Sequence, residues 1–225
     1  MKLYYHPVST TCRPIMMFAA DNDIEIDYQL VDLFKGEHTQ EPYAKLNPCC
    51  QVPMLEDGDL RLTESSAILK YLAEKSGSAA YPASDLKLRA QINEMMDWFN
   101  TGLYRDLGYG LIYPQLFPWL KRPDDAVHAG TIEWGRASAN RWLKILDESF
   151  LEGKAYLLGD KLTLADYFGA ALLTVGEVIH IDYAKYPNIK RWLDTMKSRP
   201  NWGKVNEPFY QHFVAPYKEQ TFLGV

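Results

Sequence analysis

The stretch HPVSTTCRP, residues 6–14, gathers side chains that could do chemistry. It contains three hydroxyls, a thiol, an imidazole and a guanidinium, and it lies between a strand-like run and a helical pattern. Groups at the start of a helix lie in its positive field, which favours an anion nearby. His6 has no identifiable acidic third member, so a Ser-His-Asp relay is not supported. The stretch therefore suits stabilisation of an anion better than serine hydrolysis.

Two further motifs, QVPML (residues 51–55) and TESSAIL (residues 63–69), point to a peptide ligand. A cis bond before Pro53 would turn the Val52 backbone outward and leave its N–H and C=O free to pair with an extended peptide. Glu64 can accept hydrogen bonds from an ammonium group, and Ser65 opens a helix whose free N–H groups suit a carboxylate. An edge-strand proline and simple helix capping by serine are the alternatives.

Strand and helix patterns alternate over residues 1–75 and must position these motifs. Strands are expected over residues 2–6 and 25–33 with a helix over residues 13–22 between them, and a polar loop follows. An Asp57-Gly58 turn joins two short strands, and a helix covers residues 65–75. The order βαβ-ββα predicts a small α/β domain.

Strand patterns disappear after a turn-rich linker at residues 76–86, and the rest of the chain, residues 87–225, is predicted to be an all-helical domain. The segment TLAD at residues 163–166 is a capping-box variant that opens the most apolar helix, which we expect at the centre. The helical patterns cover residues 86–111, 124–152, 163–181 and 188–200, and an aromatic-rich tail follows.

Charge and cysteine content exclude several functional classes. Lys and Arg number 24 against 29 Asp and Glu, which argues against nucleic acid as a partner. No apolar run reaches the roughly 18 residues that span a membrane, and the first residues do not form a signal peptide, so a cytoplasmic location is expected. Three cysteines without a Cys-x-x-Cys spacing favour reduced thiols and no metal site.

Three long segments together resemble the cytosolic glutathione transferases, in particular theta-class and related delta or bacterial members of the serine type. They read LYYHPVSTTCRPIMMFA, LNPCCQVPMLEDGDLRLTESSAILKYL and LLGDKLTLADYFGAALL. The resemblance implies a thioredoxin-like N-terminal domain, an all-helical C-terminal domain and a homodimer in which the α/β domain of one subunit meets the helical domain of the other. It also implies glutathione as co-substrate, no metal, and a role in detoxification.

By position, the resemblance assigns a role to each motif in glutathione binding. Val52 and Pro53 would pair with the cysteinyl backbone, Glu64 and Ser65 would bind the γ-glutamyl end, and His38 and Gln51 would reach the glycyl carboxylate. Gln51 stands where many theta-like enzymes have lysine, so we expect weaker charge pairing at that end.

The same resemblance aligns Ser9 with the serine that precedes a Pro-Cys-Arg triplet, although Thr11 replaces the proline here. Ser9 would then donate a hydrogen bond to the glutathione sulfur, unless it merely caps the helix. Thr10 or Thr11 could donate instead, and Cys12 is a rival that could form a mixed disulfide with glutathione. Arg13 is expected to support the turn by hydrogen bonding.

The helical domain would build the pocket for the electrophile. Its aromatic side chains suit a small hydrophobic substrate: Tyr104, Tyr109, Tyr113, Phe117, Trp119 and Phe213. The predicted function is glutathione transfer to such an electrophile. The alternatives are a Cys12-dependent glutathione thiol transferase or reductase, and a non-catalytic binding module with the same fold.

Overall fold

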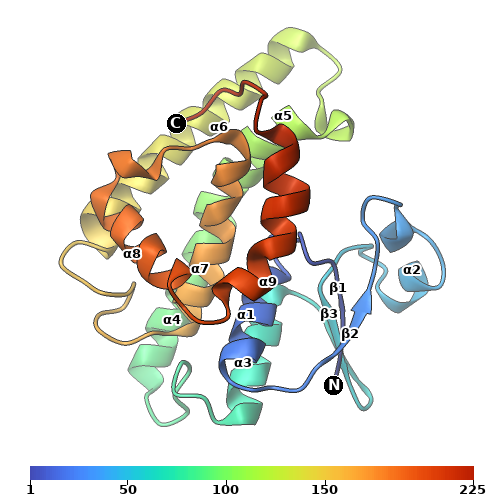
Figure 1. Ribbon diagram of the computed structural model, residues 1–225, viewed down its shortest axis with the longest axis vertical. Helices are drawn as coiled ribbons and strands as arrows, with labels where there is room; N and C mark the ends of the chain where they lie inside the picture. Colours follow the sequence, from blue (N-terminus) through green and yellow to red (C-terminus); the bar gives the residue numbers. More distant parts are fainter.

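Four short strands form one mixed sheet in the N-terminal part of the molecule (Figure 1). They are β1 (Lys2–Tyr5), β2 (Asp27–Leu30), β3 (Met54–Asp57) and β4 (Leu60–Leu62), in the order β2-β1-β3-β4. β1 runs parallel to β2 and antiparallel to β3, and β4 forms a hairpin with β3. The structure is a computed structural model that describes the whole chain, Met1–Val225.

Helices cover both faces of this sheet. α1 (Arg13–Asp21) and α3 (Ser65–Ser76) lie between the sheet and the helical part of the molecule, and the short α2 (Tyr43–Leu46) lies beyond the sheet (Figure 1). The sequence of elements confirms the predicted thioredoxin-like βαβ-ββα domain. Helix α2 was not predicted, because its four residues lie in a polar loop and are too few to show helical periodicity.

Side-chain alternation along the strands separates two cores. Leu3 and Leu55 are fully buried in the large core that also contains residues of α1, α3 and the helical part. Their neighbour Met54 belongs to a small separate cluster with Tyr43 of α2. Because neighbouring residues of a strand point to opposite faces, β3 anchors helices on both sides. β2 does not show this alternation of buried and exposed side chains. The sequence predicts an alternating strand over residues 25–33, but β2 has only four residues and is mostly exposed.

The remaining residues form the all-helical part that the sequence predicts. α4 (Leu86–Trp98) continues through a π-helical segment (Phe99–Ile112) into α5 (Tyr113–Leu116), which is longer than the expected pattern. The other long helices are α6 (Asp125–Ile145), which continues to Phe150, the central α7 (Leu164–Thr174), α8 (Pro187–Lys197) and α9 (Trp202–Phe209), which continues to Val214. α9 was not predicted, because Pro200 and Pro208 both read as helix breakers.

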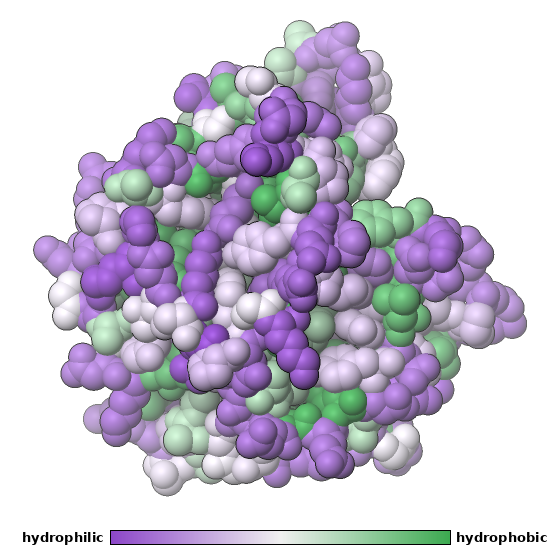
Figure 2. Space-filling view, in the orientation of Figure 1, coloured by the Kyte–Doolittle hydropathy of each residue, from purple (hydrophilic) through white to green (hydrophobic).

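The surface is polar over most of the face seen in Figure 2, with apolar side chains in scattered patches. None of the helices combines the length and the apolar character needed to cross a membrane.

Asp166 organises the start of the central helix α7, whose residues are all buried. Its carboxylate accepts a bond from the Thr163 N–H at 2.8 Å, as the predicted capping box requires, and a further bond from the Thr163 hydroxyl at 2.9 Å. It also accepts from the Leu157 N–H at 2.9 Å and from the Trp192 indole N–H at 3.0 Å. The Asp166 carboxylate thus joins α7 to α8 and to the loop that precedes α7.

Replacing Asp166 should therefore destabilise the whole molecule. We expect Asp166→Asn to lower the free energy of unfolding by about 2–4 kcal/mol. The amide nitrogen of asparagine is a hydrogen-bond donor and would face groups that are themselves donors, so some of these bonds would be lost. Urea unfolding measures this, with Asp160→Asn at an exposed position as the control that should stay within about 0.5 kcal/mol of the wild type. A loss below about 1 kcal/mol for Asp166→Asn would contradict this account.

Candidate functional site

The turn Ser9–Cys12 carries the hydroxyls of the opening motif to the start of α1. The N–H groups of Cys12 and Arg13 donate to the Ser9 carbonyl at 3.1 Å each, and the Cys12 N–H also lies 3.3 Å from Ser9 Oγ. The turn thus places the half-buried Ser9 side chain at the positive end of the helix.

The hydrogen bonds of the neighbouring threonines distinguish the three hydroxyls. Thr11 Oγ1 donates to the Val52 carbonyl at 3.1 Å, so its proton is committed. Thr10 Oγ1 is buried and pairs with the Tyr113 hydroxyl at 3.0 Å. Ser9 Oγ lies 3.2 Å from Thr11 Oγ1, which can only accept from it. The Ser9 hydroxyl therefore donates a long hydrogen bond to a neutral acceptor, Thr11 Oγ1. An anion in the cavity would be a stronger acceptor and could take the place of Thr11 Oγ1.

Cys12 lies away from the cavity. Its side chain is fully buried in the small cluster beside α2, together with Tyr43, Val52 and Met54. Burial raises the pKa of the Cys12 thiol to about 11, although hydrogen bonding from the turn opposes this. The Cys12 thiol is therefore protonated at neutral pH.

Arg13 does not support the turn with its side chain, contrary to the expectation from the sequence. Its guanidinium donates to Thr174 and Asn206 of the helical domain, at 3.1 and 2.9 Å, and to the Ala171 carbonyl at 2.8 Å. The residue is fully buried where α1 meets α7 and α9. It therefore joins the two domains immediately behind the Ser9 turn.

The Val52–Pro53 peptide bond is cis, as predicted. The Val52 N–H has no acceptor within the molecule, but its C=O accepts from Thr11 and is not free as expected. The hydroxyl of Tyr43 and the side-chain amide of Asn47, the latter at 2.7 Å, both donate to the Gln51 carbonyl. The loop before Pro53 is thus fixed, with one backbone donor unused.

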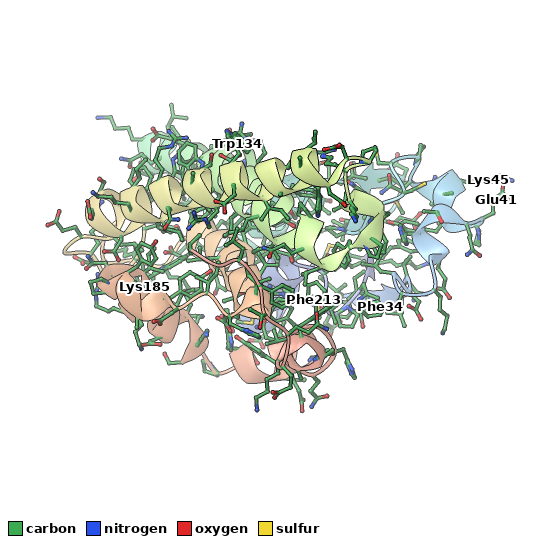
Figure 3. The ribbon with its side chains drawn as sticks, turned by 90° about the horizontal axis from the view of Figure 1, so that it is seen from above. Phe34, Glu41, Lys45, Trp134, Lys185 and Phe213 are labelled. Carbon is green, nitrogen blue, oxygen red and sulfur yellow. The ribbon has the colours of Figure 1, made fainter.

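A cavity of about 450 Å³ lies between the two domains and joins most of the predicted site residues. Ser9, His38, Gln51 and Val52 line it from the α/β domain, and Figure 3 shows Phe34 and Phe213 near this junction. The predicted aromatic residues line it from the helical domain: Tyr104, Tyr109, Tyr113, Phe117, Trp119 and Phe213.

A second cavity of about 60 Å³ adjoins the first and shares Thr11, Cys49, Gln51 and Val52 with it. Pro53, Glu64 and Ser65 line it together with Asn47 and Thr63, so two cavities rather than one bring the predicted peptide-binding residues together.

The two residues at the start of α3 are free to contact a ligand. Glu64 is exposed, makes no ion pair and has a φ of +64°, an uncommon conformation for a residue with a side chain. Ser65 is the first residue of α3, and its hydroxyl caps no backbone group. The capping alternative is therefore wrong for Ser65.

Stacked rings form the wall of the large cavity in the helical domain. The Phe117 ring lies nearly parallel to those of Trp119 and Phe213, with centroids 4.7 and 6.0 Å away. The Tyr104 and Tyr113 hydroxyls are 2.7 Å apart, and burial raises the pKa of Tyr113 to about 12. Both phenols are therefore neutral hydrogen-bond donors at physiological pH.

Several wall residues were not predicted from the sequence: Val8, Leu33, Phe34, Thr39, Cys49, Cys50 and Leu120. Phe34 is an aromatic residue in a polar loop, which is the sequence signal that could have identified it, and in the structure it is 63% exposed. His6 is buried, accepts from the Val8 N–H at 3.3 Å and packs edge-on to the Phe34 ring. It therefore supports this wall.

Comparisons with known proteins identify the domains. The family model "Glutathione S-transferase, N-terminal domain" matches residues 1–74, and "Glutathione S-transferase, C-terminal domain" matches residues 114–200. Human glutathione S-transferase theta-1 is 37% identical over 182 residues, which cover 80% of this chain and 72% of that protein.

The chain belongs to the glutathione S-transferase family. This transferase is theta-like, and solved structures agree. A delta-class glutathione transferase of Nilaparvata lugens matches with a TM-score of 0.81 and 32% identity, covering 98% of this chain and 99% of that one. Human theta-2 in complex with glutathione matches with a TM-score of 0.81 and 26% identity, covering 97% and 89%. The predicted family, fold and enzyme class are thus confirmed.

The burial of Cys12 leads to a prediction about thiol reactivity in this transferase. We expect iodoacetamide at neutral pH to alkylate Cys49, which is exposed, while Cys12 reacts only after unfolding, because its thiol is both inaccessible and protonated. Mass spectrometry of digested protein, labelled with and without urea, measures each site. Rapid alkylation of native Cys12 would show that the turn opens.

Proposed function

We propose that this transferase binds glutathione across the two cavities and that Ser9 donates a hydrogen bond to its sulfur. The observation that supports this assignment most directly is the state of the Ser9 hydroxyl. Of the three hydroxyls in the turn, it alone lines the large cavity without giving its proton to a carbonyl or pairing with a tyrosine.

A donor at this position meets the chemical need of the reaction. A free thiol has a pKa near 8.5, so only a few per cent is thiolate at neutral pH. Lowering that pKa by about two units requires roughly 2.7 kcal/mol of preference for the anion. A charge-assisted hydrogen bond and the positive end of α1 are together of this size. The thiolate then attacks the electrophile, a carbon–sulfur bond forms, and the leaving group departs with the displaced electron pair.

The remaining parts of the tripeptide fit the free groups around the cavities. The unused Val52 N–H suits the cysteinyl carbonyl, and Glu64 with Ser65 at the start of α3 suits the γ-glutamyl ammonium and carboxylate. His38 and Gln51 line the large cavity and suit the glycyl carboxylate. His38 Nδ1 is buried without a partner, which leaves it a hydrogen-bonding group to satisfy.

The electrophile is then a small hydrophobic molecule held against the aromatic wall of the helical domain. The wall combines parallel rings with the Tyr104 and Tyr113 hydroxyls, so an apolar body with one polar group is accommodated. The burial of Cys12 argues against the thiol-transfer alternative. We further propose that two copies associate as a homodimer.

Removing the Ser9 hydroxyl tests the proposal. We expect Ser9→Ala to lower turnover about 10- to 100-fold and to abolish the ultraviolet thiolate absorbance of bound glutathione, because a charge-assisted bond contributes about 1.5–3 kcal/mol. Glutathione affinity by calorimetry should change little. Thr11→Val is the matched control, since the Thr11 proton is held by Val52. Wild-type turnover in Ser9→Ala, or loss of the thiolate signal only in Thr11→Val, would contradict the assignment.

The position of Gln51 leads to a second prediction. Gln51 is exposed and lines both cavities. We expect Gln51→Lys to tighten glutathione binding about two- to fivefold, the effect of one exposed ion pair with the glycyl carboxylate. The gain should shrink at high salt. Calorimetry at low and high ionic strength measures both, and an unchanged or weaker affinity would place the glycyl end elsewhere.

A further inference from the structure

Arg13 is a fully buried cation at the junction of the two domains. It donates to three neutral oxygens, those of Thr174 Oγ1, Asn206 Oδ1 and the Ala171 carbonyl, and its guanidinium carbon lies 3.7 Å from the centroid of the Phe209 ring. Its Nε has no partner.

No carboxylate pairs with Arg13, although twelve other ion pairs occur in the molecule. Glu177 is the acidic group nearby, and it is engaged by Lys197 at 2.6 Å. A buried charge without a counter-ion is costly. Its burial lowers the pKa of Arg13 only to about 10, so the charge persists at neutral pH.

The location of this charge adds a second cost. Arg13 is the first residue of α1, where the helix dipole already makes the field positive and disfavours another cation. A buried cation at a helix N-terminus contradicts two local rules at once. Such conflicts are found at functional sites, where the binding of an anion can offset the free-energy cost of the buried cation.

The cavities supply the place for that anion but no cation of their own. No Lys or Arg lines either cavity, and the larger one has His38 as its only ionisable nitrogen. Bound glutathione with an ionised sulfur would bring three negative groups and one ammonium. Within this chain, positive charge for it would therefore come from backbone N–H groups, His38 and buried groups behind the cavity lining.

We propose that Arg13 is a positioning residue that fixes the Ser9 turn against the helical domain and whose uncompensated charge lowers the pKa of the bound glutathione thiol. This inference rests on the proposed function. The backbone N–H of Arg13 bonds to the Ser9 carbonyl at 3.1 Å, so the backbone of Arg13 belongs to the same turn as the proposed donor, while its guanidinium bonds to the helical domain.

Other ionisable groups around Arg13 do not cancel its charge at neutral pH. Tyr104 and Tyr113 face it from the cavity side and Tyr210 from the segment after α9, and burial raises the pKa of each, so all three are neutral. Cys12, the residue before α1, is a neutral thiol because burial raises its pKa. Glu177 is paired with Lys197.

An isosteric substitution separates the charge of Arg13 from its packing. Asn206→Asp keeps an oxygen 2.9 Å from the Arg13 guanidinium and adds a counter-ion, and it loses only the bond that the Asn206 amide donates to the Trp202 carbonyl at 3.0 Å. We expect it to raise the pKa of the bound glutathione thiol by about one unit, a tenfold lower thiolate fraction at neutral pH. Ultraviolet titration of the glutathione complex measures this pKa. Arg13→Met should raise it by a similar amount.

Arg199→Met is the matched control. Arg199 bonds to Asp21 at the other end of α1, at 2.5 Å, and so joins the same helix to the helical domain with a compensated charge. Its loss should lower stability without moving the thiol pKa. S-methylglutathione, which has no ionisable sulfur, should bind wild type and Asn206→Asp equally.

The outcomes distinguish this role from the proposed function. An unchanged thiol pKa in folded Asn206→Asp that still binds S-methylglutathione would overturn the role of Arg13 alone, whether or not Arg13→Met folds. A shift as large in Arg199→Met would also overturn it. A wild-type complex whose thiol titrates like free glutathione would overturn the proposed function and this role together.

Discussion

The attachment of α1 to the helical domain is the constraint on which the site depends. Arg13 at its first residue and Asp21 at its last both make buried or partly buried polar contacts with the helical domain. Because the helix is held at both ends, the turn that precedes it has little freedom. The Ser9 and Thr10 hydroxyls of that turn therefore line a cavity that side chains of the helical domain complete.

The ends of α1 are held in different ways. Asp21 meets the Arg199 guanidinium, so charge at the C-terminal end is compensated. Arg13 contacts only neutral oxygens and the face of an aromatic ring, so the positive charge at the N-terminal end has no counter-ion. This difference is explained if a bound anion provides the negative charge that the surroundings of Arg13 lack. The aromatic side chains that line the cavity carry no charge, so they would not screen the electric field of Arg13. They would also exclude water from the site, which strengthens electrostatic interactions.

The fold and much of the site could be predicted from local sequence patterns. The alternation of strand and helix, the hairpin signal at Asp57-Gly58 and the capping box at Thr163 are short-range signals. The hairpin is present, but its two loop residues are Gly58 and Asp59, because Asp57 pairs with Leu60 as the last residue of β3. The partners of Arg13 lie between 158 and 193 residues away, so no local pattern could identify them. The burial of Cys12 likewise depends on packing against α2, a helix too short to predict.

We expect the sulfur of bound glutathione to lie at the Ser9 hydroxyl as an anion. A crystal structure of the glutathione complex would show this. Ser9 Oγ should lie about 3 Å from the sulfur, with Thr11 still bonded to the Val52 carbonyl and Cys12 still buried. A sulfur beyond hydrogen-bond reach of Ser9, or joined to Cys12 in a disulfide, would contradict it.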